Sequence, residues 1–324
     1  MVSPSARGAL FGEGARGGEG RCLTTDSPPS VVDGPVGRAE GGGGGKTKFY
    51  VDVHRLANKD RKKKTDENYH IYTDGINFGK TTRVADIPAK AGDELYVDII
   101  PVELTDEFVE VLRRGVKVLY LRRMTVLAKK REELGLSKTS RNDIKAMMAL
   151  DPKWFREVGE DFLVMRRLIC VHRSLLKTYV SLTNRMRALQ ETERRILMRL
   201  VKATQEAMNE MAAKIVDEAG RRIPAYDAVV RALGIEGENH LYSREALAEI
   251  MVYVERTTSF KHLKKFFGIY KGSKYHHRAA RAALSRLTAA IIKNTHHRAR
   301  DEEQILKRIW KTVKETRERL EAPA

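Results

Sequence analysis

The sequence predicts a mixed α/β domain, then a long helical arm, then an all-helical domain. From Phe49 onward, short apolar runs alternate with a helical pattern and return as strands. Beyond Trp154, apolar residues recur every three or four positions over many turns, and the helical pattern continues to the end of the chain. We therefore expect a glycine-rich segment at 1–45, an α/β domain at 46–155, a coiled-coil arm at 156–220 and a basic helical domain at 221–324.

Composition favours a nucleic-acid-binding protein and argues against a membrane protein or a disulfide-rich one. The 324 residues suffice for about two domains, and 61 Lys and Arg against 43 Asp and Glu give a net charge of +18. Such an excess indicates a polyanionic partner, with nucleic acid favoured over acidic lipid. No run approaches the roughly 18 apolar residues of a membrane span, and two cysteines exclude a disulfide scaffold. We expect a cytoplasmic, nucleoid-associated protein without a membrane segment.

The first 45 residues differ from the rest of the chain. They hold 13 of the 24 glycines and four of the nine prolines. Such a segment buries too little apolar area to offset its ordering entropy, so we expect it to be disordered. Two interpretations are open: a functional arm, or a mis-assigned start or cloned extension.

The α/β domain is expected to consist of strands with helices between them. Thr105 is suited to begin a helix that runs to Arg114 and ends at Gly115, and a second helix begins at Asp143 and stops before Pro152. Gly75-x3-Gly79-Lys80-Thr81 is one residue short of a phosphate-binding Walker loop, which argues against an NTPase. The expected strands are 49–53, 68–72, 82–87, 95–100 and 116–121.

The expected arm carries apolar residues at a helical spacing from Leu168 to Leu200. Glu193 interrupts this seam, and His172 falls where another apolar residue is expected. No proline breaks the pattern before Gly220. A coiled coil that joins protomers into a homo-oligomer is one interpretation; a long helix packed on its own domain is the other.

Residues 256–300 form a basic block, with twelve Lys or Arg, five His and no acidic residue. A solvated helix face mixes both signs of charge, so the block indicates a surface that contacts phosphates. Adjacent histidines in a helix point about 100° apart, which favours solvent- or phosphate-facing roles over metal binding for His276-His277 and His296-His297. The expected nucleic-acid-binding residues are Lys261, Lys264, Lys265, Lys271, Lys274, Arg278 and Arg281.

Three aspartates are the candidate catalytic residues. Asp52 and Asp98 each interrupt an apolar strand, where a carboxylate is costly unless it has a metal or another partner. Asp143 opens a later helix. Carboxylates from two strands and a helix start that converge on one point are how RNase H-like folds hold two Mg²⁺ ions. Each aspartate alone also fits an edge-strand or helix-start residue.

Several motifs occur along the chain in a definite order. Phe49–His54 reads F-Y-V-D-V-H, and Lys138–Asp143 reads K-T-S-R-N-D. These resemble the G-I-D-V-H-K strand and the K-T-D-x-x-D-A helix start of the IS-110 transposases, and the order and spacing of further motifs are similar. Leu95–Pro101 looks like the strand that carries the family's glutamate, with Asp98 in that place. Further similar segments are Val109–Arg123, Phe162–Leu189, Ala246–Tyr270 and Lys271–Leu284.

The resemblance implies a RuvC-like N-terminal domain and a C-terminal domain that bears a serine nucleophile. Asp52, Asp98 and Asp143 would then bind Mg²⁺ or Mn²⁺, and the partners would be DNA and a guide RNA. Ser140 stands where the family has a third acid, which lowers the expected metal affinity unless Glu103 or another acid compensates. Ser273 is either the nucleophile or a helix cap.

Three functions follow as alternatives. The first is an active transposase or recombinase that cuts and joins DNA strands. The second is a catalytically impaired descendant that only binds nucleic acid. The third is an unrelated α/β nuclease or RNA-binding protein.

Overall fold

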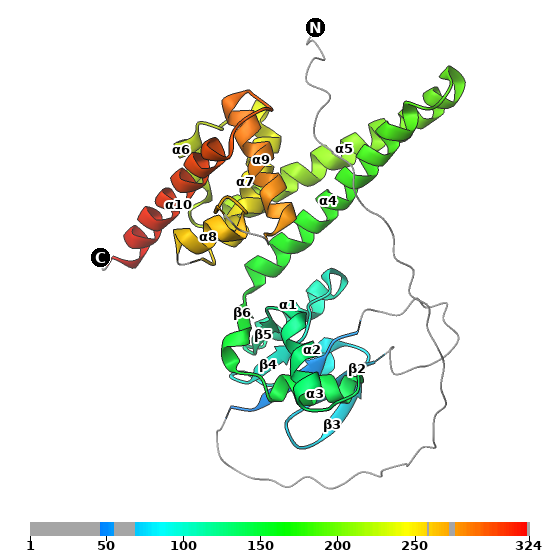
Figure 1. Ribbon diagram of the computed structural model, residues 1–324, viewed down its shortest axis with the longest axis vertical. Coiled ribbons are helices and arrows are strands. Elements are labelled where there is room, and N and C mark those ends of the chain that lie inside the picture. The colour runs from blue at the N-terminus through cyan, green and yellow to red at the C-terminus, as the bar shows by residue number, and fades with distance from the viewer. Residues whose placement is uncertain (1–45, 55–68, 258, 272–275, 323–324) are drawn as a thin grey trace. The chain divides into compact units, whose positions relative to one another are not determined.

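The computed structural model describes residues 46–54, 69–257, 259–271 and 276–322 (Figure 1). By its contacts the chain divides into two units, 1–45 and 46–324. The segment 1–45, expected to be disordered, lies outside the described residues. Among the residues that are described, no helix is long and apolar enough to cross a membrane.

The first part of the second unit is built on a six-stranded sheet in the order β3-β2-β1-β4-β5-β6. Strands β1, β4 and β5 are parallel neighbours, and the other three pairings are antiparallel. The mixed α/β sheet expected from the sequence is confirmed. Its strands are β1 (Lys48–Asp52), β2 (His70–Thr73), β3 (Phe78–Thr81), β4 (Glu94–Val97), β5 (Lys117–Leu121) and β6 (Phe155–Val158).

Both faces of this sheet are buried, because helices cover each of them and successive side chains of a strand point to opposite faces. Odd-numbered residues of β1 and β4, such as Val51 and Val97, pack with Phe108 of α1 (Thr105–Arg113). Even-numbered Tyr96 packs on the opposite face with Met147. That second face is covered by α2 (Met124–Glu133) and α3 (Ser140–Met148).

Several expected elements of this domain differ from the structure. The strand expected at 82–87 is wrong: the third strand is Phe78–Thr81, and a 3-10 turn, Val84–Asp86, follows it. Gly79 pairs with Tyr72 of strand β2, and a glycine is needed there because a Cβ would collide with the Tyr72 ring. The helix expected from Asp143 begins earlier, at Ser140, where Thr139 caps it by accepting from the Asn142 N–H.

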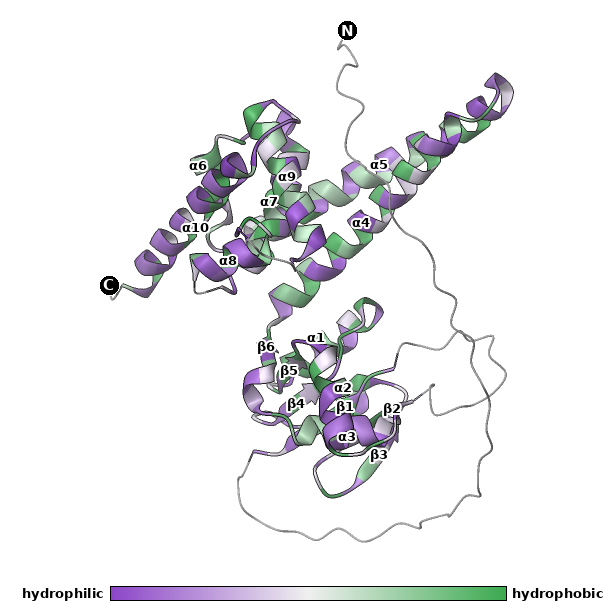
Figure 2. Cartoon of the chain, in the orientation of Figure 1, coloured by the Kyte–Doolittle hydropathy of each residue, from purple (hydrophilic) through white to green (hydrophobic). Residues whose placement is uncertain are grey.

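The expected arm is helical, but it consists of two helices that lie side by side in Figure 1. They are α4 (Glu160–Met186) and α5 (Glu191–Arg222). Glu193, which interrupts the apolar seam, closes a capping box with Gln190 and so begins the second helix. Green and purple residues alternate along both helices (Figure 2), and Ile196 is 68% exposed. Association of protomers through this pair stays a prediction.

The rest of the chain is helical, as expected. The core includes Tyr226, Leu247 and Phe267, and α4 contributes Met165 and Leu168 to it. The helices are α6 (Tyr226–Leu233), α7 (Leu241–Val254), α8 (Phe260–Phe266), α9 (Arg278–Ile292) and α10 (Ala299–Glu321).

Candidate metal and nucleic-acid site

Asp52 and Asp98 lie side by side at the same edge of the sheet. Strands β1 and β4 are parallel, and the register that pairs Val51 with Val97 brings Asp52 next to Asp98, one residue further along each strand. Neighbouring strands are about 4.8 Å apart. Asp52 ends β1 and Asp98 directly follows β4. Both are even-numbered, and the odd-numbered residues of these two strands pack with α1, so the two side chains lie on the face covered by α3.

Asp98 is fixed by the backbone of the neighbouring strand. Its Oδ1 accepts a hydrogen bond of 3.0 Å from the Val53 N–H. The side chain is buried, as is that of Asp52, with residue exposures of 6% and 8%. Two carboxylates are therefore held together away from water.

His54 connects the strand end to α3. Its Nε2 lies 2.9 Å from Asp52 Oδ2 and 3.1 Å from the Oγ of Ser140. Both contacts use the same ring nitrogen, so His54 does not relay a proton between the two groups as a catalytic triad does. Ser140 stands at the position where the resemblance expects a third acid, and the structure puts His54 against it.

Asp143 lies one turn along α3 from Ser140 and is paired with a cation. Arg131 of α2 donates to its Oδ1 over 2.7 Å, and the two side chains are 16% and 13% exposed. Burial raises the pKa of Asp143, and the positive charge of Arg131 opposes that rise. The negative charge of Asp52 also raises the pKa of Asp143.

The buried carboxylate pair is electrostatically unfavourable. Burial, and then the charge of Asp52, raise the pKa of Asp98 from 3.8 to about 7, although three backbone hydrogen bonds oppose the rise. His70 on β2, whose Nδ1 accepts from the His54 N–H, has its pKa lowered to about 4 by burial and by His54. The site therefore joins two crowded carboxylates to a neutral imidazole.

The chemistry of Asp52 and Asp98 fits a hard divalent cation, which binds carboxylate oxygens and relieves their mutual repulsion. The third acid is less well placed, because Asp143 is bound to Arg131. Within the described part of the chain, no three His, Cys, Asp or Glu side chains are arranged to hold a metal ion. Glu103, the expected compensating acid, is exposed in the turn Val102–Leu104. Asp52 and Asp98 therefore suit a divalent cation, but among the described residues they are not joined by a third acid in position to bind it.

The basic block is partly neutralised by acids from outside it. Lys264 pairs with Glu303 at 2.6 Å, and Arg281 pairs with Glu302 at 2.5 Å. Sequence counting missed these partners because they lie on α10, beyond residue 300. Lys265 is exposed and lies 5.3 Å from the ring centre of Tyr270.

Three of the expected nucleic-acid-binding residues remain available. Lys261, Lys271 and Arg278 are exposed and form no ion pair with any residue that the structure describes. Lys274 and Ser273 fall outside the described residues, so the choice between nucleophile and helix cap for Ser273 stays open.

The two histidine pairs lie just before helices α9 and α10, not inside them, and within each pair one ring is exposed and the other is partly buried. His276 and His296 are exposed. His277 is half-buried: it stacks on Phe266 at 5.0 Å and caps α9 by accepting from the Ala280 N–H. His297 Nε2 lies 3.0 Å from Glu302. The expectation of solvent- or phosphate-facing roles is therefore wrong for His277 and His297, which are structural.

The sequence analysis missed His54, His70 and Arg131 as members of the site. A histidine two residues after Asp52 was a usable signal for His54, because alternate residues of an extended chain share a face. His70 and Arg131 carried no such signal, since only the pairing of β1 with β2 and the packing of α2 on α3 bring them to the acids.

Comparisons of the chain with protein-family models and with curated proteins find no match.

Proposed function

We propose that this chain is a DNA transposase or site-specific recombinase of the IS-110 type, dependent on Mg²⁺ or Mn²⁺ and guided by an RNA. The observation that carries the proposal is the parallel register that brings Asp52 beside Asp98, on the face that α3 covers. The sheet order, with antiparallel β2 and β3 on one side of β1 and parallel β4 and β5 on the other, supports an RNase H-like assignment.

In this proposal Asp52 and Asp98 would hold the cation, and Asp143 would be a third ligand only without its ion pair to Arg131. A bound divalent cation would neutralise charge on the scissile phosphate. Lys261, Lys271 and Arg278 bind backbone phosphates, which fixes the strand without reading its sequence. A serine from the helical domain, for which Ser273 is the candidate, would be the nucleophile. Its oxygen would bond to phosphorus as the bond from phosphorus to one sugar oxygen breaks. The serine proton would pass to water, and the released sugar oxygen would take up a proton from water.

A second candidate is favoured by the contacts that the acids already make. His54 contacts one carboxylate oxygen of Asp52, and Arg131 donates to one carboxylate oxygen of Asp143. Ser140 has no carboxylate with which to bind a metal. An impaired descendant that binds nucleic acid without cutting it would keep the basic residues and lose the need for the acids.

The test is cleavage of a branched DNA junction with Mg²⁺ or Mn²⁺ by the full chain. We expect wild-type protein to cut and Asp52→Asn to lose about 100-fold or more in rate, because loss even of a group supporting a metal ligand costs about 10–100-fold. Binding of the junction, measured by fluorescence anisotropy, should be kept by Asp52→Asn.

Asp86→Asn is the matched control, since it removes an exposed carboxylate of the same domain whose one ion pair among the described residues is with Arg83 at 3.6 Å. It should cut like wild type. Tight junction binding with no cleavage by wild-type protein under either metal would contradict the transposase and favour the impaired descendant.

A further inference from the structure

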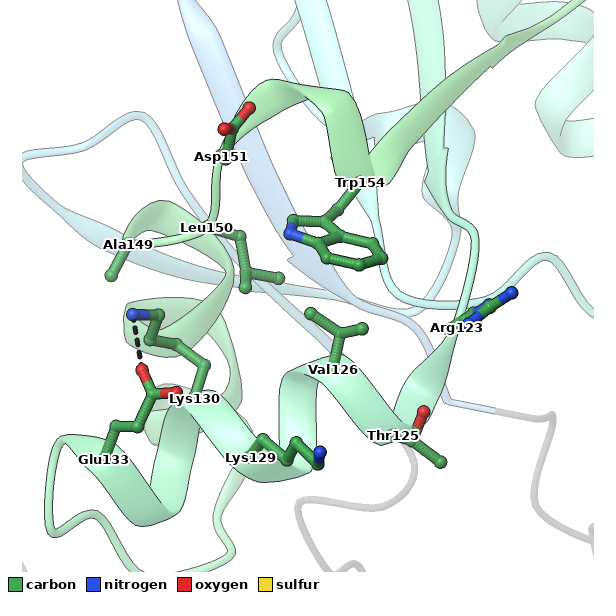
Figure 3. Close-up of a pocket in the computed structure, with 10 residues that line it drawn as sticks. All are labelled: Arg123, Thr125, Val126, Lys129, Lys130, Glu133, Ala149, Leu150, Asp151 and Trp154. Atoms are coloured by element: carbon green, nitrogen blue, oxygen red, sulfur yellow. Dashed lines mark hydrogen bonds and ion pairs between the residues drawn. The ribbon is translucent and has the colours of Figure 1, made fainter.

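A hollow of about 470 Å³ in the α/β domain shares no residue with the acidic site. It is bounded by α2, by the residues that follow α3 and by the turn Pro152–Trp154, as Figure 3 shows. Its volume lies within the range of roughly 300–1,000 Å³ that is typical of ligand pockets. Nothing in the proposed cleavage reaction uses it.

One wall of the hollow is the aromatic ring of Trp154. The backbone of this residue is fixed: its N–H donates to the Asp151 carbonyl over 3.0 Å, and its carbonyl accepts from the backbone N–H of Arg122 over 2.9 Å. The half-buried indole packs against the apolar core beneath the sheet, and Figure 3 shows it beside Leu150 and Val126. A fixed indole with one open side is a stacking platform for a planar ring.

The hollow also carries a net positive charge. Its two acids are already paired, Glu133 with Lys130 at 2.7 Å and Asp151 with Lys153 at 2.7 Å. Arg123 and Lys129, at the start and in the second turn of α2, are exposed. Neither makes an ion pair with any other residue in the described ranges.

We propose that this hollow binds an unpaired nucleobase of a single-stranded nucleic acid, with the base on Trp154 and the adjoining phosphate on Arg123 and Lys129. The base must be unpaired, because bases inside a duplex are covered on both faces by their neighbours. The proposal rests on the proposed function only in taking a nucleic acid as the partner. It needs neither the metal nor strand cleavage.

The test compares labelled oligo(dT) and oligo(U) with an abasic deoxyribose-phosphate oligomer of equal length and charge, by fluorescence anisotropy with the full chain. Wild-type protein should bind oligo(dT) or oligo(U) more tightly than the abasic oligomer. Trp154→Leu should lose about 5- to 150-fold in that affinity, from the ~1–3 kcal/mol that stacking contributes per base, and should bind the abasic oligomer unchanged. Trp154→Tyr should retain most of the affinity.

Three further variants keep the test independent of folding. Arg123→Gln with Lys129→Gln changes exposed residues only and should weaken binding of every oligomer, whereas Lys117→Gln, an exposed lysine at the start of β5, should not. Trp310→Phe leaves Trp154 as the single tryptophan, and oligo(dT) should quench its fluorescence.

Equal affinity of wild-type protein for abasic oligomer and oligo(dT), or unchanged affinity in Trp154→Leu, would overturn the proposal. The junction-cleavage assay separates this failure from failure of the proposed function. Base-dependent quenching without cleavage supports base binding in the hollow and not the proposed function. Cleavage without base-dependent binding overturns base binding in the hollow and leaves the proposed function standing.

Discussion

Asp98→Asn is expected to stabilise the metal-free protein at pH 8 by about 2–4 kcal/mol, although it alters a candidate catalytic residue. The pKa of Asp98 is raised to about 7 by burial and by Asp52, so the folded chain holds this proton longer than the unfolded chain does. The Asp98 contribution to the free energy of unfolding therefore falls as pH rises from about 4 to about 7, and stays low above that range. An asparagine removes this cost.

The measurement is urea unfolding of wild type and Asp98→Asn at pH 5 and pH 8. His70, with its pKa lowered to about 4, also changes the free energy of unfolding between pH 4 and pH 6.5, with the opposite sign to Asp98. Both proteins contain His70, so its contribution cancels when their free energies of unfolding are subtracted, and the difference reports Asp98. We expect a small difference at pH 5 and the full gain at pH 8. A gain that does not grow with pH would contradict the buried-pair description.

Arg286→Ala is expected to destabilise the helical domain by about 3 kcal/mol. Glu245 and Glu249 of α7 are each only 1% exposed, and Arg286 of α9 lies 3.1 Å from the first and 3.4 Å from the second. Removing this cation leaves Glu245 with His172 at 3.1 Å and Glu249 with Arg173. Buried charges that lose a partner cost about 3–5 kcal/mol, and the remaining partners reduce that here.

Urea unfolding at neutral pH measures this effect. Arg286→Lys should lose less, because it keeps the charge. Arg195→Ala is the control: it breaks an ion pair with Glu191 in which both side chains are more than 60% exposed, and it should cost under about 1 kcal/mol. A loss in Arg286→Ala no larger than in Arg195→Ala would show that the two glutamates do not depend on Arg286.

Apolar runs in the sequence were sufficient to predict the central strands of the sheet. The apolar runs around Val51, Leu95 and Val118 are strands at close to the expected residues, because both faces of these strands are buried. The helix from Thr105 ends at Gly115, whose φ of +81° favours glycine, as expected. The sequence did not predict the two short edge strands β3 and β6. Strand β3 contains Gly79, and β6 is four residues long with the charged Arg156 and Glu157 inside it.

Long-range pairing explains what the sequence did not reveal. The turn between α4 and α5 has neither glycine nor proline at 187–190, so a single long helix was the natural expectation. His172, which falls in the seam, is buried beside Glu245 of α7. For the site, Asp52 and Asp98 could be named from their apolar surroundings, and Asp143 from its place at the start of a helix. The engagement of Asp143 by Arg131 required the packing of α2 on α3.

The central claim is that Asp52 and Asp98 together bind a divalent cation, and calorimetric titration of the full chain with Mn²⁺ tests it most directly. Because Asp98 must lose its proton to act as a ligand, we expect uptake at pH 8 that weakens at pH 6. Asp52→Asn and Asp98→Asn should each abolish the uptake, and Asp86→Asn should leave it unchanged. No uptake at pH 8, or uptake that survives Asp52→Asn, would contradict the claim.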